Sequence, residues 1–232
     1  MKDRLLQVFS SYDIDLNQTQ AQQFEDYYKY LVEVNKNLNL TAITEEEDVI
    51  YKHFLDSVLP HKMFKQNAKV IDIGTGAGFP GIPLKILRPD LEITLLDSLQ
   101  KRVNFLNQTI QLLNLKNITA VHDRAEDYVK KTRETFDVAT SRAVAKVNTL
   151  SEYMLPYVKI GGIAIMYKSL KTNEEINEGQ KAISTLGGKI ETIEEINVKE
   201  IDATRSFVVV KKNSLTPKTY PRGKNLPKTK PI

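Results

Sequence analysis

Three glycines at alternate positions, Gly74, Gly76 and Gly78, directly follow the short apolar run 69–73. Glycine has no Cβ, so the backbone can approach a ligand closely, and the N–H groups at the start of a following helix face that ligand. A proline within residues 80–83 can begin this helix, because the first helical residues have no intrahelical partner for an N–H. A strand, a glycine-rich turn and a helix in this order are typical of a nucleotide-type cofactor site. A tight turn without a ligand is the structural alternative.

The residues around the turn indicate which cofactor it holds. Residues 76–81 match the dinucleotide pattern G-x-G-x-x-G, but Gly74 already follows the strand and Asp72 lies inside the strand end. A carboxylate at that point disfavours an anionic pyrophosphate and favours a cofactor with a cationic centre and an ammonium group. S-adenosylmethionine (SAM) has both. We therefore predict a SAM site that includes Asp72 and the three glycines.

The composition is that of an ordinary globular protein. Of the 232 residues, 41% are hydrophobic and 27% are charged, which suits one large α/β domain with an extension. No apolar stretch reaches membrane-spanning length and no signal-type apolar core follows the first four residues, so we expect a cytoplasmic protein without membrane contact. Cysteine is absent, which excludes disulfides, thiolate metal sites and cysteine nucleophiles. The three histidines, His53, His61 and His122, show no metal-ligand spacing, and we predict no metal.

The net charge of +4 is unevenly distributed. From Ala203 to the C-terminus there are eight basic residues and no acidic one, which leaves 25 basic and 29 acidic residues in the rest of the chain. A neutral to acidic body with a basic end indicates that the C-terminus meets a polyanion. A solvated, unstructured tail explains the same charges equally well.

Residues 1–66 are predicted to be helical. In residues 18–38, large apolar side chains recur at spacings of three and four, which marks one face of an amphipathic helix. A second helix is expected through Val49, His53 and Val58. We interpret this region as a helical N-terminal extension of the domain that follows.

Between residues 67 and 212 the pattern changes to alternating strands and helices, which predicts a parallel sheet covered on both faces. Strands are expected at residues 69–73, 92–97, 118–122, 135–140 and 160–167. Helices are expected near residues 81–88, 99–114, 125–131, 146–158 and 172–186. Two final strands follow each other as a hairpin, at residues 188–197 and 204–211. The fold class is therefore α/β, a Rossmann-like class I SAM-dependent methyltransferase fold with a seven-stranded, mostly parallel sheet, and residues 213–232 form an irregular basic tail.

Polar residues at the ends of the predicted strands are expected to meet, because ligands of open α/β sheets bind beyond the carboxyl ends of the strands. Asp97 ends the second strand, about twenty residues after the glycines, where a carboxylate can accept hydrogen bonds from ribose hydroxyls. Asp97 can also cap the helix that begins near Ser98. Ala125 and Glu126 follow the third strand and can contact adenine, although an acidic first helical turn explains Glu126 nearly as well.

Arg142 follows the fourth strand, where the target of methyl transfer enters in enzymes of this fold. The D/N-P-P-Y/F motif of DNA amino-group methyltransferases is missing from this position. Arginine cannot act as a base near neutral pH, but it can bind a phosphate, a carboxylate or a base edge. These properties favour a target atom with a free lone pair, such as N7 of guanine, and catalysis mainly by positioning. A structural ion pair is the alternative role for Arg142.

Over nearly its whole length the chain resembles the RsmG family, also called GidB, which methylates N7 of a guanine in 16S rRNA of the bacterial small ribosomal subunit. The most specific block is residues 72–85, which includes the sequence G-T-G-A-G-F-P-G-I-P-L. Further matching segments lie at residues 39–43, 53–57, 96–98, 101–102, 124–126, 141–145 and 220–222. The resemblance implies direct SN2 transfer of the methyl group from SAM to the guanine.

The resemblance also assigns roles to individual residues. It implies SAM contacts at, or near, Gly74, Phe79, Asp97, Ala125, Glu126 and Arg142. It implies that the basic C-terminus touches RNA through Arg222 and its neighbours, while Lys168 and Arg205 are RNA-side residues by position only. The chain departs from the family at Asn225, where a glycine is usual, so the tail can differ in shape. We expect removal of residues 217–232 to weaken RNA binding and to leave SAM affinity intact.

Two other functions stay open at this point. A small-molecule SAM methyltransferase, with the N-terminal helices closing over its substrate, is disfavoured by the acid-free tail and by the lack of an apolar lid sequence. A Rossmann oxidoreductase or nucleotide-binding regulator is disfavoured by Asp72 and by the terminal hairpin. Nothing in the sequence requires more than a monomer.

Overall fold

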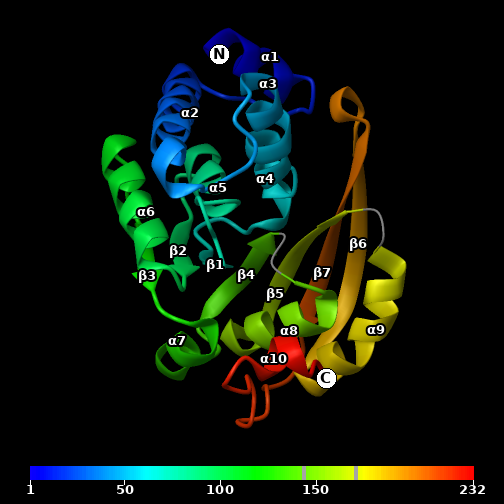
Figure 1. Ribbon diagram of the computed structural model, residues 1–232. Helices are drawn as coiled ribbons and strands as arrows, with labels where there is room; N and C mark the ends of the chain where they lie inside the picture. Colours follow the sequence, from blue (N-terminus) through cyan, green and yellow to red (C-terminus); the bar gives the residue numbers. More distant parts are fainter. Residues whose placement is uncertain (143–144, 170–171) are drawn as a thin grey trace.

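The computed structural model describes residues 1–142, 145–169 and 172–232 (Figure 1). Its centre is a seven-stranded sheet with the strand order β3-β2-β1-β4-β5-β7-β6. The strands are β1 (Lys69–Ile73), β2 (Glu92–Asp97), β3 (Ile118–His122), β4 (Phe136–Arg142), β5 (Val158–Ser169), β6 (Gly188–Val198) and β7 (Ala203–Lys212). Strands β1 to β5 pair in parallel, whereas β7 runs antiparallel to both β5 and β6. The predicted sheet with its terminal antiparallel hairpin is confirmed.

Helices cover both faces of the sheet. Successive residues of a strand point to opposite faces, so each strand contributes apolar side chains to a core on either side. Val70 belongs to one hydrophobic core and its neighbour Ile71 to the other. Helices α5 (Gly81–Leu87) and α6 (Gln100–Leu112) pack on the first face together with the N-terminal helices. The second face carries α7 (Ala125–Thr132), α8 (Val147–Met154) and α9 (Thr172–Thr185). Near-continuous apolar strands are expected where a parallel sheet is buried on both sides.

The N-terminal extension contains α1 (Lys2–Ser10), α2 (Gln18–Leu38) and a third helix in three parts: α3 (Glu46–Val49), the π-helical segment η1 (Ile50–Leu55) and α4 (Asp56–Val58). Helix α2 begins with a reciprocal cap, in which the Asn17 side chain accepts the Gln20 N–H at 2.9 Å and the Gln20 side chain accepts the Asn17 N–H at 3.0 Å. Figure 1 shows the extension, in blue and cyan, beside α5 and above the end of β4. Its apolar residues join the core of the first sheet face.

The C-terminal tail, residues 213–232, turns back from β7 and lies against α8, where it forms the short helix α10 (Leu226–Thr229) (Figure 1). Short 3-10 turns complete the described elements: η2 (His61–Met63), η3 (Leu155–Tyr157) and η4 (Lys199–Ile201). Among the helices of the described residues, none is long and apolar enough to span a membrane.

Candidate active site

The glycine-rich turn after β1 depends on backbone conformations that only glycine adopts easily. Gly74, Gly76 and Gly78 have φ angles of 69°, 62° and 99°. A Cβ on Gly78 would lie 2.5 Å from Ile82 Cδ1 and 2.9 Å from the Tyr27 hydroxyl oxygen, whereas a Cβ on Gly76 would meet nothing within 4 Å. Gly78 is therefore required by packing, and Gly76 leaves open space beside the loop.

Asp72 is completely buried beneath this loop. Its Oδ2 accepts hydrogen bonds from the Thr75 hydroxyl at 2.6 Å and from the Gly81 N–H, at the start of α5, at 2.9 Å. Its Oδ1 has no hydrogen-bond partner among the described residues. Burial raises the pKa of Asp72 to about 7, although the two hydrogen bonds act in the opposite direction. A buried carboxylate oxygen without a partner fits a cofactor that brings positive charge to the loop.

Asp97, at the end of β2, holds the loop from the other side. Its Oδ2 accepts the Gly76 N–H at 3.0 Å, and its Oδ1 accepts the Leu99 N–H at 2.9 Å, immediately before α6. Arg102 Nη1 lies 3.4 Å from the same Oδ2. Asp97 therefore fixes the relative position of the glycine loop and α6, and the predicted ribose contact stays a prediction.

A cavity of about 260 Å³ opens at the carboxyl ends of β1, β2 and β3. Four of the predicted cofactor residues line it: Gly74, Asp97, Ala125 and Glu126. The Ala125 carbonyl accepts a hydrogen bond from the Tyr157 hydroxyl at 2.6 Å, which fixes the start of α7 at the cavity. A left-handed glycine and three carboxylates, those of Asp97, Asp123 and Glu126, suit a nucleoside with a cationic end. We call this space the cofactor cavity. The other predicted cofactor residues are not part of its lining: Asp72, Gly76, Gly78, Phe79 and Arg142.

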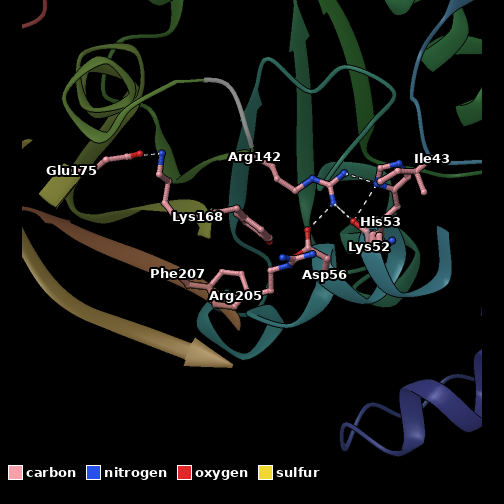
Figure 2. Close-up of a pocket in the computed structure, with 10 residues that line it drawn as sticks. Ile43, Lys52, His53, Asp56, Arg142, Lys168, Glu175, Arg205 and Phe207 are labelled. Atoms are coloured by element: carbon pink, nitrogen blue, oxygen red, sulfur yellow. Dashed lines mark hydrogen bonds and ion pairs between the residues drawn. The ribbon is translucent and has the colours of Figure 1, made fainter. Parts of the chain in front are cut away.

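A second cavity, of about 340 Å³, lies between the N-terminal helices and the ends of β4, β5 and β7 (Figure 2). We call it the charged cavity. It brings together three basic residues that were predicted separately, Arg142, Lys168 and Arg205, with the aromatic side chains of Tyr167 and Phe207. The remaining lining residues are Ile43, Lys52, His53, Asp56 and Glu175.

Arg142 lies at the wall of the charged cavity with only 13% of its side chain exposed. Its Nη1 donates to Asp56 Oδ2 at 2.8 Å and to the Lys52 carbonyl at 3.1 Å, and its Nη2 contacts His53 Nδ1 at 3.2 Å (Figure 2). The guanidinium also lies over the Phe79 ring, 4.8 Å from the ring centre. The predicted structural ion pair is therefore present. The same contacts hold the guanidinium in one orientation at the strand end.

Asp56 connects Arg142 to Arg205. Its Oδ1 lies 2.6 Å from Arg205 Nε, while its Oδ2 receives the hydrogen bond from Arg142. The carboxylate is 9% exposed, and two cations compensate the cost of burying its charge. The strand-end rule did not single out Asp56 or His53, because both lie on a helix of the extension. The sequence feature that could have indicated these two residues is the segment 53–57, which resembles the family and contains both of them three positions apart.

His53 completes the contacts around Arg142. Its Nε2 lies 2.8 Å from the Thr41 hydroxyl, and its ring stacks on Phe79 with 4.4 Å between the ring centres. His53 Nδ1 lies 3.2 Å from Arg142 Nη2 and also 3.2 Å from the Lys52 carbonyl oxygen, and the tautomer of the neutral ring decides which of these contacts is a hydrogen bond. Burial, followed by the nearby Arg142 charge, lowers the pKa of His53 to about 3. His53 therefore stays neutral at physiological pH.

The remaining predicted residues have clear places in the structure. Lys168 Nζ donates to the Ala145 carbonyl at 2.9 Å and lies 2.6 Å from Glu175 Oε2. Since Ala145 lines the cofactor cavity and Lys168 lines the charged cavity, this bond links the two. Arg222 lines neither cavity and is paired with Glu152 of α8. Residues 143–144, which belong to the block 141–145, lie outside the described residues.

Metal ligands are not grouped in the described part of the chain. Nowhere among residues 1–142, 145–169 and 172–232 do three His, Asp or Glu side chains come together as a metal site requires. The expectation that no metal takes part stays a prediction.

Comparison with solved structures places the fold. A SAM dependent methyltransferase from Aquifex aeolicus matches with a TM-score of 0.57 and 16% identity, over 74% of this chain and 96% of that chain. The TYW2 protein of M. jannaschii, solved in complex with AdoMet, matches with a TM-score of 0.58 and 15% identity, over 74% of this chain and 79% of that chain. At this level of identity the likeness concerns the fold alone.

Sequence comparison places the family. The family of rRNA small subunit methyltransferase G, GidB, matches residues 20–206. Ribosomal RNA small subunit methyltransferase G of Desulforamulus reducens is 50% identical over 98% of this chain and 97% of its own length. The same enzyme of Lachnoclostridium phytofermentans is 50% identical over 98% of this chain and 96% of its own length. The chain therefore belongs to the rRNA small subunit methyltransferase G family.

Proposed function

We propose that this protein transfers a methyl group from SAM to N7 of a guanine in 16S rRNA of the small ribosomal subunit. The observation that carries the proposal is the position of Arg142 at the end of β4, beside the strand that leads into the glycine loop. The Ser141 hydroxyl donates to the Ile73 carbonyl at 2.7 Å, which ties the end of β4 to the start of that loop. Ile73 lines the cofactor cavity and Arg142 lines the charged cavity, so the two cavities adjoin at these joined strand ends.

The cofactor cavity suits SAM. Gly74, Asp97, Ala125 and Glu126 line the space for its nucleoside and methionyl parts. Asp72 adds a buried carboxyl group whose Oδ1 has no partner among the described residues, and a cationic cofactor beside it favours the charged form of this group. Bound SAM supplies an electrophilic methyl group on a sulfonium centre. After transfer the product is the neutral thioether S-adenosylhomocysteine.

The residues between the cavities are suited to positioning the target base. Guanine N7 has its own lone pair, so attack on the methyl carbon forms the N–C bond without removal of a proton. The electron pair of the broken S–C bond goes to sulfur, and the positive charge moves to the guanine. Neither Arg142 nor neutral His53 acts as a base in this scheme, because arginine stays protonated and a pKa of about 3 makes His53 a weak base. Their shared task is to hold the groups around the methyl-transfer site in one orientation.

We expect the charged cavity to receive the RNA. Lys168 and Arg205 line it and offer positive charge for phosphates, with Glu175 and Asp56 as their partners within the protein. The rings of Tyr167 and Phe207 are buried in the wall of the cavity. Arg222 stays a predicted RNA contact on the basis of the family resemblance, since its guanidinium is paired with Glu152. An rRNA substrate also puts the reaction in the cytoplasm, and we expect the protein to work as a monomer.

The proposal is tested by transfer of labelled methyl from SAM to small ribosomal subunits that lack the modification, followed by nucleoside analysis. We expect the label in 7-methylguanosine. SAM binding without label on the subunits, or label in another nucleoside, contradicts the proposed target. No SAM binding contradicts the proposed cofactor.

The RNA side is tested in the same assay with a matched pair of lysine variants. Lys168→Gln should raise KM for the subunit and reduce the salt dependence of binding, because it removes a cation from the charged cavity. Lys159→Gln is the control, since Lys159 lies at the opposite end of β5, paired with Asp137, and should leave both quantities unchanged. Equal behaviour of the two variants contradicts an RNA contact at Lys168.

A further inference from the structure

The C-terminal tail is fixed to the body of the protein by several groups of hydrogen bonds. Arg222 donates from its backbone N–H and its Nε to Glu152 Oε1, at 2.7 and 2.9 Å, and from Nη2 to Oε2 at 2.6 Å. Arg133 donates to the carbonyl groups of Thr216, Pro217 and Tyr220, at 3.1, 3.0 and 2.8 Å. The hydroxyl of Thr149, on α8, donates to the Pro227 carbonyl at 3.0 Å. A tail with so many fixed contacts is not the solvated, unstructured segment that its composition allowed.

The Arg222–Glu152 pair is the strongest of these connections. The Glu152 side chain is completely buried, with 0% exposed, so its charge depends on the guanidinium that covers it. Loss of one partner from such a pair leaves a buried charge without compensation. The pairing raises the pKa of Arg222 above its ordinary value. The positive charge of Arg222, which the sequence predicted to contact RNA, is thus used inside the protein to hold the tail.

The fixed tail forms part of the cofactor cavity. Asn225 and Lys228 line this cavity together with Gly74, Asp97 and Glu126. Helix α8 supplies both the attachment and the adjoining wall, because Thr149 binds the tail and also lines the cavity. Figure 1 shows the tail, in red, against α8 and close to α7, which begins at Ala125 and Glu126. The tail therefore lies on the side of the cavity where the adenine end of SAM is expected.

We propose that the C-terminal tail is a working part of the cofactor site, in which the Arg222–Glu152 pair holds Asn225 and Lys228 as a wall against the nucleoside of SAM. An asparagine amide has donors and an acceptor, and a lysine has three donors, which match the ring nitrogens and the amino group of adenine. This inference rests on the proposed function, because it takes SAM as the ligand. It also replaces the expectation that removal of residues 217–232 leaves SAM affinity intact.

The direct test is calorimetric measurement of SAM affinity in the full chain and in two variants of the tail. Lys228→Gln should weaken SAM binding about tenfold, since it removes a charged donor from the cavity wall. Lys218→Gln is the matched control, because it makes the same change at an exposed lysine of the same tail that does not line the cavity. Both lysines are exposed, so neither variant is expected to disturb folding.

Hydrogen exchange of the unaltered protein gives a second readout. Addition of SAM should slow exchange in the tail around residues 222–230, while the far strand β6 should not respond. Unchanged SAM affinity in Lys228→Gln together with no protection of the tail overturns the inference and leaves the proposed function intact. Failure of the unaltered chain to bind SAM overturns both. An effect of Lys228→Gln on KM for RNA alone assigns the tail to RNA and also overturns the inference.

Discussion

At the scale of single residues, Arg142 combines a structural contact with a predicted catalytic role. Its guanidinium reaches Asp56, the Lys52 carbonyl and His53 at the same time, which requires the planar fork of an arginine. We expect Arg142→Lys to keep the charge but to lose the orientation, and to lower kcat about 10- to 100-fold while stability changes little. The control is Arg205→Lys, which makes the same exchange on the other side of Asp56 and should act on KM for the subunit. An Arg142→Lys enzyme with normal kcat shows that the ion pair is only structural.

His53 makes stability depend on pH. Its pKa is about 3 in the folded protein, because of burial and the Arg142 charge, and about 6.5 when unfolded. The unfolded state therefore binds the proton more readily, and stability falls as the pH drops below about 6.5. Between pH 7 and pH 5 the contribution of His53 to this loss is about 2 kcal/mol. Urea unfolding at both pH values should show a smaller loss for His53→Gln, and equal losses in the two proteins contradict the assignment.

At the scale of elements, the strand ends could be predicted from the sequence and the helical side of the site could not. An apolar run that is followed by a glycine, as at Gly74, or that ends in an acidic residue, as at Asp97, predicts the end of a strand. Both residues could therefore be predicted from the sequence. Asp56 and His53 approach Arg142 only after the N-terminal helices have packed across the sheet, and helical periodicity does not encode that docking. Carbonyl groups of the π-helical segment η1 face Arg142, and a π-helix has no reliable sequence signature. The attachment of the tail could not be predicted for a related reason. Arg222 of the tail pairs with Glu152, and the burial of Glu152 is a property of the tertiary structure.

The glycine loop gives a prediction with a matched control. Gly76 and Gly161 both have left-handed φ angles, of 62° and 82°, and a Cβ on either would meet nothing within 4 Å. Alanine at each position should cost about 1 kcal/mol of stability through backbone strain. Gly76→Ala should also weaken SAM binding about tenfold, because its methyl group enters the space beside the cofactor loop. Gly161 lies near the start of β5, at the end of the strand away from Lys168, so Gly161→Ala should bind SAM normally. Equal affinities in the two variants contradict a cofactor contact at Gly76.

At the scale of the whole molecule, the N-terminal extension and the sheet share one hydrophobic core. Phe24 of α2 lies 4.9 Å from Phe54 of η1 between ring centres, and Phe54 lies 6.3 Å from Phe79 of the cofactor loop. All three rings are buried in the core that also contains Val70 of β1. The extension is thus joined to the catalytic fold by apolar contacts rather than by a flexible linker.

A shared core predicts that the extension and the sheet unfold together. Native-state hydrogen exchange should give the same opening free energy for peptides from α2 and from β2. Phe24→Ala should lower both by the same amount, about 3–5 kcal/mol, because a large buried ring is lost from one common core. If α2 exchanges at a clearly lower free energy, or if Phe24→Ala weakens α2 alone, the extension is a separately opening lid. In that case Asp56 and His53 would leave Arg142 each time the lid opens, and orientation of the guanidinium would depend on substrate closing it.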